Sequence, residues 1–262
     1  MKSEFTANNP FGNDRYGYLW EMLAKHKPLK HLDYGAYNGR IINQMVKDGL
    51  TKEAIGVDAN KDIVDESNPK LDKFVSLKYI NPKPVVVLPF ADNTFDSVSL
   101  LDVLEHVFDQ RTLIDELIRV LKPKGVLIIT VPQHHIFSFL DIANVKFRFP
   151  RLHKFLHNIM GKEALYYERF VECRNGLFGD IELEKMWHQH FTPQDLIDLV
   201  EEGGCECDNF DGAGLFDRFL IPMFYLFGNH DISGTTSILQ KIRQWDLRRF
   251  NRAHLFTTFV KK

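Results

Sequence analysis

Two glycines four residues apart, within residues 31–40, constrain the fold more than any other feature of this chain. A short apolar run ends at Leu32, Gly35 and Gly39 bracket a turn, and apolar residues then recur at helical spacing up to Gly49. This order predicts a strand, a glycine turn and a helix. Such a turn lets a ligand approach bare backbone, and the helix N-terminus offers unpaired N–H groups to polar atoms. Because many strand-to-helix loops contain glycine for steric reasons alone, the turn indicates a ligand site only in combination with other residues of the chain.

A carboxylate lies beyond the turn at an informative distance. The apolar run 54–57 ends in Asp58, about twenty residues after the glycines. In a βαβ unit, an acidic residue at the tip of the second strand binds the hydroxyl groups of a ribose. We therefore expect Asp58 to contact a ribose, and the alternative role is to cap a helix that begins at Lys61.

The remaining apolar patterns predict an α/β fold. We expect a helix that ends near residue 27, another from Asp109 to about residue 121, and strands at 74–80, 97–101 and 126–132. The last of these is continuously apolar, which is typical of a central parallel strand. Ligands of open α/β sheets bind outside the carboxyl ends of the strands, so residues just after these strands are site candidates.

Composition excludes several classes of protein. With 33 Lys and Arg against 35 Asp and Glu, the chain lacks the overall positive charge of most nucleic-acid binders. Three cysteines without a secretory signal favour a reducing cytoplasm, and Cys205-x-Cys207 has no second ligand pair at metal-binding spacing. The longest apolar run, residues 214–228, is too short to span a bilayer, although it could lie on one. We expect a cytoplasmic protein without nucleic-acid partners, with contact at the inner face of a membrane as the alternative location.

Five short motifs occur in order over about a hundred residues. They are Leu32-Asp33-x-Gly35, Gly56-Val57-Asp58, Leu88-Pro89-Phe90 to Phe95-Asp96, Leu104-Glu105-His106-Val107 and Leu121-Lys122-Pro123-x-Gly125. As a set they resemble the class I S-adenosylmethionine-dependent methyltransferases. The resemblance implies a single domain, residues 1–262, with a Rossmann-like, seven-stranded, mostly parallel sheet, helices on both faces, and an antiparallel terminal hairpin at 205–210 and 253–260. It also continues through residues 188–204, where Thr192 and Asp195 form a capping box.

The same resemblance implies S-adenosylmethionine as the cofactor. The positions that match the cofactor-binding residues of the family are Asp33, Gly35, Gly39, Asp58, Ala59, Leu101 and Asp102. Two departures stand out. Tyr37 occupies the position of the family's middle glycine, where a bulky residue does not easily take a positive φ, so we expect a locally different turn. Residues 84–87 also lack the acidic residue with which many relatives contact adenine.

Two segments exceed what the core fold needs. Residues 133–187 are expected to form a mostly helical lid or substrate-binding segment, and residues 212–251 a second insertion before the last strand. The first contains a basic stretch interleaved with aromatic residues at 146–155 and an acidic stretch at 180–185. This pattern favours either a site for an anionic or sugar-containing acceptor or an ordinary solvated helical subdomain. The sequences Phe-Arg-Phe-Pro at 147–150 and Gly-Leu-Phe-Gly-Asp at 176–180 resemble methyltransferases of bacterial surface-polysaccharide and lipid-linked glycan pathways.

These features predict an O-methyltransferase that acts on a glycan, on a lipid-linked molecule or on another small-molecule hydroxyl. Two alternatives remain open. The first is a quinone or small-aromatic O-methyltransferase, which the Glu-His-Val motif also resembles. The second is a non-catalytic protein that binds S-adenosylmethionine. It is suggested by Tyr37, which replaces the family's middle glycine. The sequence does not predict the oligomeric state.

Histidines are the candidates for a general base, since their pKa lies near neutral pH. His134 follows the strand 126–132, and His190 precedes the capped helix; His135 and His188 are their neighbours, and His106 lies in the Glu-His-Val motif. If residues 102–106 were helical, Asp102, Glu105 and His106 would share a face and could hold a divalent cation. We favour the simpler role, in which Glu105 and His106 line and brace the pocket, and therefore expect no metal.

Overall fold

The computed structural model describes residues 15–81, 87–141, 144, 147–159, 161–170, 187–220 and 238–262. Several features of the sequence lie outside these residues. They are the prolines at 82 and 84, the positions 84–86 at which an adenine contact was sought, Lys146, Cys173, the motif at 176–180 and the acidic stretch at 180–185.

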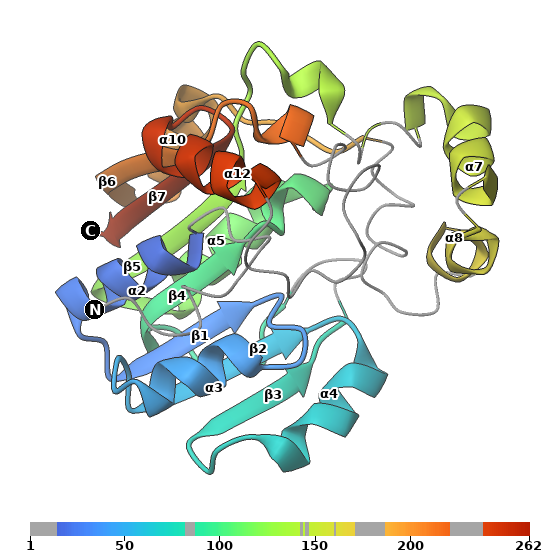
Figure 1. Cartoon of the computed structure of the whole chain (residues 1–262). Coiled ribbons are helices and arrows are strands. Elements are labelled where there is room, and N and C mark those ends of the chain that lie inside the picture. Colours follow the sequence, from blue (N-terminus) through green and yellow to red (C-terminus); the bar gives the residue numbers. More distant parts are fainter. Residues whose placement is uncertain are drawn as a thin grey trace.

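A seven-stranded sheet in the order β3-β2-β1-β4-β5-β7-β6 forms the centre of the molecule (Figure 1). The strands are β1 (Lys30–Tyr34), β2 (Glu53–Asp58), β3 (Val75–Tyr79), β4 (Phe95–Leu101), β5 (Leu121–Pro132), β6 (Cys205–Ala213) and β7 (His254–Lys261). The first five are parallel, and β7 runs antiparallel to both β5 and β6. The predicted Rossmann-like sheet with its antiparallel terminal pair is confirmed.

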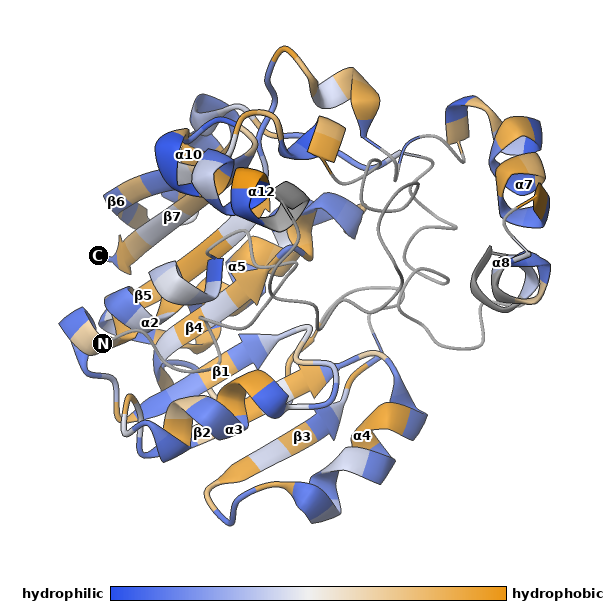
Figure 2. Cartoon of the chain, viewed as in Figure 1, coloured by the Kyte–Doolittle hydropathy of each residue, from blue (hydrophilic) through white to orange (hydrophobic). Residues whose placement is uncertain are grey.

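Helices cover both faces of this sheet. They are α2 (Arg15–His26), α3 (Arg40–Lys47), α4 (Lys61–Ser67), α5 (Gln110–Val120), α7 (Pro150–Ile159), α8 (Glu163–Phe170), α10 (Pro193–Glu201) and α12 (Ile238–Arg249), with 3-10 turns at Asn68–Lys70, Leu104–His106 and Ser138–Leu140. Side chains of α5 and α10 enter one buried apolar cluster, and those of α2, α3, α4 and α12 enter another. Figure 2 shows the apolar residues concentrated on the central strands.

Local sequence signals fix where the helices begin. The side chain of Asp109 accepts a hydrogen bond from the N–H of Thr112 and so caps α5. Thr192 and Asp195 form the predicted capping box of α10, with Pro193 at the first helical position. Because these caps satisfy backbone N–H groups that the helices leave unpaired, each helix begins at a defined residue.

Two isolated backbone bridges mark the insertions. Gln133 pairs with Phe191, and Gly214 pairs with Asn251, so each excess segment leaves and rejoins the core at adjacent points. The second insertion was predicted to begin at residue 212, but β6 extends to Ala213. Within the first insertion, α7 and α8 stand apart from the sheet, at the right of Figure 1. In the part of the chain that the structure describes, no helix has the length and apolar character needed to cross a bilayer.

Candidate active site

The glycine turn after β1 has the backbone that its sequence requires. Gly35 has φ 82° and Gly39 has φ 69°. A side chain at Gly35 would lie 2.6 Å from Cγ2 of Val103, so this position needs glycine for space as well as for conformation. Tyr37 was expected to change the turn locally, yet it takes φ 50°, the left-handed conformation that was thought difficult for it. The premise that a bulky residue would avoid this conformation is wrong, and the turn has a positive φ at all three positions.

Asp58 closes this turn from the tip of β2. Its Oδ2 accepts a hydrogen bond from the Tyr37 N–H at 2.7 Å, and its Oδ1 accepts one from the Asn60 N–H at 2.9 Å. Burial raises the pKa of this carboxyl, and the backbone N–H groups partly offset the effect. Since each carboxylate oxygen can accept two hydrogen bonds, both could also accept from a ribose. The alternative role as a helix cap is wrong, because Asn60 is the N-cap of α4 and Asp58 is not.

The other predicted cofactor carboxylates are held by neighbouring side chains. Asp33 is buried and accepts a hydrogen bond from Ser99 Oγ at 2.5 Å. Asp102, with φ 51°, forms an ion pair with Arg15 of α2 and accepts a hydrogen bond from Thr130 Oγ1 at 2.7 Å. Leu101 ends β4 half-buried, and Ala59 is exposed just beyond β2. All of these residues lie at or near the sheet edge that carries the glycine turn, and their contact with a cofactor stays a prediction.

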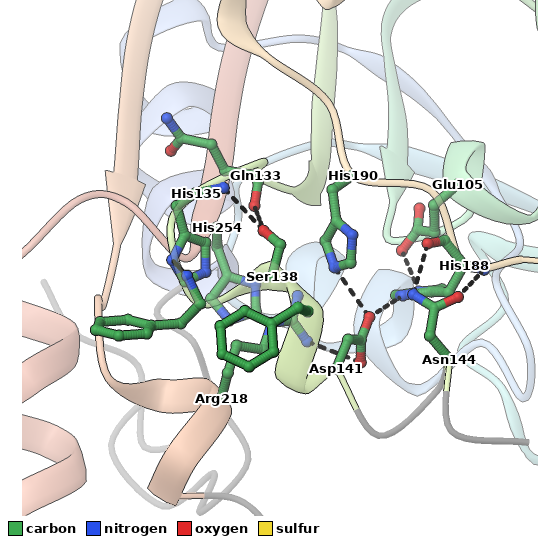
Figure 3. Close-up of polar contacts among 12 residues, drawn as sticks. Glu105, Gln133, His135, Ser138, Asp141, Asn144, His188, His190, Arg218 and His254 are labelled. Atoms are coloured by element: carbon green, nitrogen blue, oxygen red, sulfur yellow. Dashed lines mark hydrogen bonds and ion pairs between the residues drawn. The ribbon is translucent and has the colours of Figure 1, made fainter. Parts of the chain in front are cut away.

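A cluster of buried charged groups lies where β4 and β5 end and the first insertion begins (Figure 3). Asp141 Oδ2 lies 2.6 Å from Nδ1 of His188 and 2.9 Å from Nε2 of His190. The other oxygen of Asp141 accepts a hydrogen bond from Nη1 of Arg218 at 3.3 Å. Oε1 of the buried Glu105 lies 3.7 Å from Nε2 of His188. One carboxylate thus joins two histidines and an arginine, and a second carboxylate braces one of the histidines.

The charges in this cluster shift the titration of its members. Burial would lower the pKa of His188, but Asp141 and Glu105 outweigh it and raise the pKa to about 9. Burial would likewise raise the pKa of Asp141, and the neighbouring His188, His190 and Arg218 instead hold it well below its usual range. For His190, burial dominates and lowers the pKa.

The two histidines also line a cavity of about 460 Å³. Its walls are His134, Asn144, Phe147, Arg148, Trp187, His188, Gln189 and His190. Both base candidates, His134 and His190, are therefore on one cavity. The ring of His106 packs against His188 at 4.9 Å between centroids, which brings the third histidine candidate to the same site.

The metal trio considered from sequence does not form. Asp102 faces Arg15, whereas Glu105 and His106 converge with His188. The reason is that residues 104–106 form a 3-10 turn that begins after Asp102, so the three side chains do not share a helical face.

Sequence reasoning missed Asp141 and Arg218. Asp141 lies 47 residues before His188 and Arg218 lies 77 residues after Asp141, with no spacing pattern to connect them. The useful signal was the His-x-His pair itself, which points both rings to one side of an extended segment.

Asn144 fixes the position of the His188 backbone. Its side-chain amide donates to the carbonyl of His188 at 2.9 Å and accepts from the His188 N–H at 2.9 Å.

Comparison with known proteins agrees with this geometry. Residues 32–129 match a family model described as a methyltransferase domain. The demethylmenaquinone methyltransferase of Bacillus licheniformis is 33% identical over 102 residues, which cover 38% of this chain and 44% of that protein. The enzyme of the same description from Staphylococcus aureus is 26% identical over 144 residues, covering 54% of this chain and 58% of the other. The chain thus spans about half the length of the curated relatives it matches.

Solved structures extend the likeness to nearly the whole fold. An S-adenosylmethionine-dependent methyltransferase from Mesorhizobium loti aligns with a TM-score of 0.58 at 13% identity, over 97% of this chain and 100% of that one. A putative methyltransferase of Haloferax volcanii, in complex with the activator Trm112, aligns with a TM-score of 0.56 at 16% identity, over 99% and 98% of the two chains. At these identities the comparison shows a shared fold.

The class predicted from the motifs is therefore confirmed. The chain has the fold of solved S-adenosylmethionine-dependent methyltransferases, and residues 32–129 match the methyltransferase-domain family.

Proposed function

We propose that this protein binds S-adenosylmethionine and methylates a hydroxyl group of a small molecule held in the histidine cavity. The strongest support is that the cavity and the predicted cofactor residues lie at the same edge of the sheet. Asp102 follows β4, and Glu105, three residues later, reaches His188 on the cavity wall. A methyl donor at the glycine turn and an acceptor in the cavity would then approach each other across the ends of β4 and β5.

The chain's own contribution to such a reaction is mainly positioning. S-adenosylmethionine supplies an activated methyl group that passes to the acceptor by direct displacement, so that no covalent enzyme intermediate is needed. Holding the two reactants in line removes much of the entropic cost of their meeting. His134 and His190 line the cavity and are the proposed groups for removing the hydroxyl proton.

The lining of the cavity favours a glycan or another polar ring as acceptor. Phe147 and Trp187 offer aromatic faces, while Asn144, Arg148 and Gln189 carry hydrogen-bonding groups. Rings stacked on aromatic side chains, with their hydroxyl groups bonded to amides and guanidinium groups, fit such walls. The similarity to demethylmenaquinone methyltransferases supports a second candidate, a quinone or small-aromatic acceptor.

The outer face of α7 supports contact with a membrane, as a lipid-linked acceptor would require. Phe149, which directly precedes α7, and four apolar side chains of the helix fall within an arc of about 120° at 100° per residue. All are at least one-third exposed: Phe149, Leu152, Phe155, Leu156 and Ile159. On the side toward α8, His153 is buried against Tyr166, so the apolar arc points away from that helix. The exposed Arg151 lies beside the arc, which suits an interfacial helix on an anionic membrane.

Methyl transfer from labelled S-adenosylmethionine tests the function. The purified chain would be offered separate fractions of glycan, lipid-linked glycan, quinone and RNA at limiting cofactor, with the Asp58→Ala variant as the control of weakened cofactor binding. We expect label in a glycan or lipid-linked fraction. Label in the quinone fraction alone would favour the second candidate, and cofactor binding without transfer to any fraction would support the non-catalytic alternative.

A further inference from the structure

Three potential ligand atoms of the histidine cluster lie close together. They are Oδ2 of Asp141, Nδ1 of His188 and Nε2 of His190, and all lie within 4.8 Å of one another. Asp141 and both histidines are at least nine-tenths buried as side chains. Two imidazoles and one carboxylate are the ligand set of many three-residue sites for divalent transition metals.

Asp141 and His188 are hydrogen-bonded to each other at 2.6 Å, but two other atoms of the cluster lack a hydrogen-bond partner among the described residues. Nε2 of His190 approaches Asp141 to 2.9 Å, yet among the described residues it makes no hydrogen bond of acceptable direction. Two ligands of one cation have this relationship, because each points at the cation and not at the other ligand. Oε2 of Glu105, whose side chain is only 1% exposed, is also without a hydrogen-bond partner in the described structure. A buried carboxylate oxygen without a donor requires a compensating charge.

We propose that Asp141, His188 and His190 bind one divalent transition-metal cation of the zinc type. Imidazole nitrogens favour zinc and its neighbours over magnesium and calcium, which prefer oxygen ligands. The site differs from the trio considered from sequence, since it contains neither Asp102 nor His106.

The surrounding residues form the outer layer that metal sites usually have. A histidine bound to a metal through one ring nitrogen commonly donates through the other nitrogen to a carboxylate. Glu105 stands in that position, 3.7 Å from Nε2 of His188, while Nδ1, hydrogen-bonded to Asp141 at 2.6 Å, would exchange that bond for the cation. Arg218 donates to Oδ1 of Asp141, the oxygen that faces away from the two histidines, so Oδ2 stays turned toward them.

The cation would be reachable from the cavity, because His188 and His190 form part of its wall. A Lewis acid there would polarise an acceptor hydroxyl and help it to lose its proton. His190 would then serve as a ligand, which leaves His134 as the base candidate. This inference concerns metal binding alone and does not rest on the proposed methyl transfer.

Metal titration of the whole chain tests the site without methyl donor or acceptor. Chelator-treated protein would be titrated with Zn²⁺ by calorimetry and with Co²⁺ by visible absorption. We expect one equivalent to bind, and the Co²⁺ spectrum to show histidine coordination. Asp141→Asn and His190→Ala should weaken Zn²⁺ binding at least a hundredfold, and Glu105→Gln by about 10- to 100-fold.

Two matched histidine variants separate this site from its neighbours. His134→Ala changes the same cavity wall, and His106→Ala changes the ring beside His188; both should keep Zn²⁺ affinity within threefold. Absence of stoichiometric binding to the wild-type chain would overturn the proposal, as would a loss in His106→Ala as large as that in His190→Ala. Circular dichroism would confirm folding, and His190→Gln replaces any alanine variant that fails to fold. Failure here would leave the methyl-transfer proposal unaffected, because that activity is measured separately.

Discussion

Ser99 connects His31 to Asp33 across the buried face of the sheet. Ser99 Oγ donates to Asp33 Oδ1 at 2.5 Å and lies 2.9 Å from Nε2 of His31, while Nδ1 of His31 lies 2.7 Å from Ser97 Oγ. When Asp33 is ionised, the Ser99 proton is used on it, and Nε2 of His31 is then the donor to Ser99. Nδ1 then accepts from Ser97, so this neutral histidine carries its proton on Nε2.

The pair His31 and Asp33 should give opposite contributions to the pH dependence of stability. Burial raises the Asp33 pKa from 3.8 to about 7, so its contribution to the free energy of unfolding falls as pH rises through that window. Burial lowers the His31 pKa from 6.5 to about 3, so its contribution falls as pH drops through that window. Between about pH 4 and 6.5 the two effects cancel.

Asp33→Asn should expose the effect of His31 alone. We expect the variant's stability to rise with pH by about 1.4 kcal/mol per unit between pH 4 and 6.5, relative to wild type. Urea unfolding at several pH values in this range measures the difference. Parallel pH profiles for the variant and the wild type would contradict the raised pKa of Asp33.

Asp58→Ala should weaken S-adenosylmethionine binding tenfold or more, because each lost charged hydrogen bond costs about 1.5 to 3 kcal/mol. Calorimetry measures the affinity, and a thermal melt would show whether the turn that Asp58 closes is intact. Asp62→Ala, which changes an exposed carboxylate in the first turn of α4, serves as the control and should bind normally. Unchanged affinity in Asp58→Ala would exclude the ribose contact.

His134→Ala and His190→Ala should each lower the maximal rate at saturating cofactor and acceptor. The loss should be about a hundredfold for the residue that acts as the base. If the maximal rate of His190→Ala instead depends on the Zn²⁺ concentration, His190 acts as a metal ligand and not as the base. If both variants stay within about threefold of wild type across neutral pH, no histidine base operates and positioning accounts for catalysis.

Phe155→Glu should reduce binding to anionic lipid vesicles about tenfold or more, since it adds a charge to the apolar arc of α7. Sedimentation with phosphatidylserine-containing vesicles measures the bound fraction. Glu163→Gln, in the first turn of α8, is a control outside the arc and should bind as wild type does. Equal sedimentation of wild type and Phe155→Glu would exclude this helix as a membrane contact.

The central sheet could be predicted because its signals are local. The glycine turn, the carboxylate that ends β2 and the caps of α5 and α10 depend on residues close in sequence, and the structure confirms each element. Tyr37 shows where a local rule fails. Its hydrogen bond to Asp58 holds the backbone in a conformation that the side chain alone disfavours.

The candidate site was harder to predict because its groups come from distant segments. Asp141 and Arg218 belong to two different insertions, and they meet only because both insertions leave the same edge of the sheet. The hydrogen bonds that connect His31, Ser99 and Asp33 could not be predicted either, since the sequence around Ser97 and Ser99 is typical of an ordinary buried strand. Only the register between β1 and β4, which pairs His31 with Ser97 and Asp33 with Ser99, brings them together.

The position of β7 has a consequence for how the chain is made. This strand lies between β5 and β6 but follows both in sequence, so β5 ends at Pro132 well before its partner at His254–Lys261 has been synthesised. During that interval one edge of a strongly apolar strand has no hydrogen-bonding partner in the sheet. Such edges pair readily with other chains. We therefore expect nascent chains that stall between these two strands to need chaperone protection, whereas the finished sheet buries β5 on both sides.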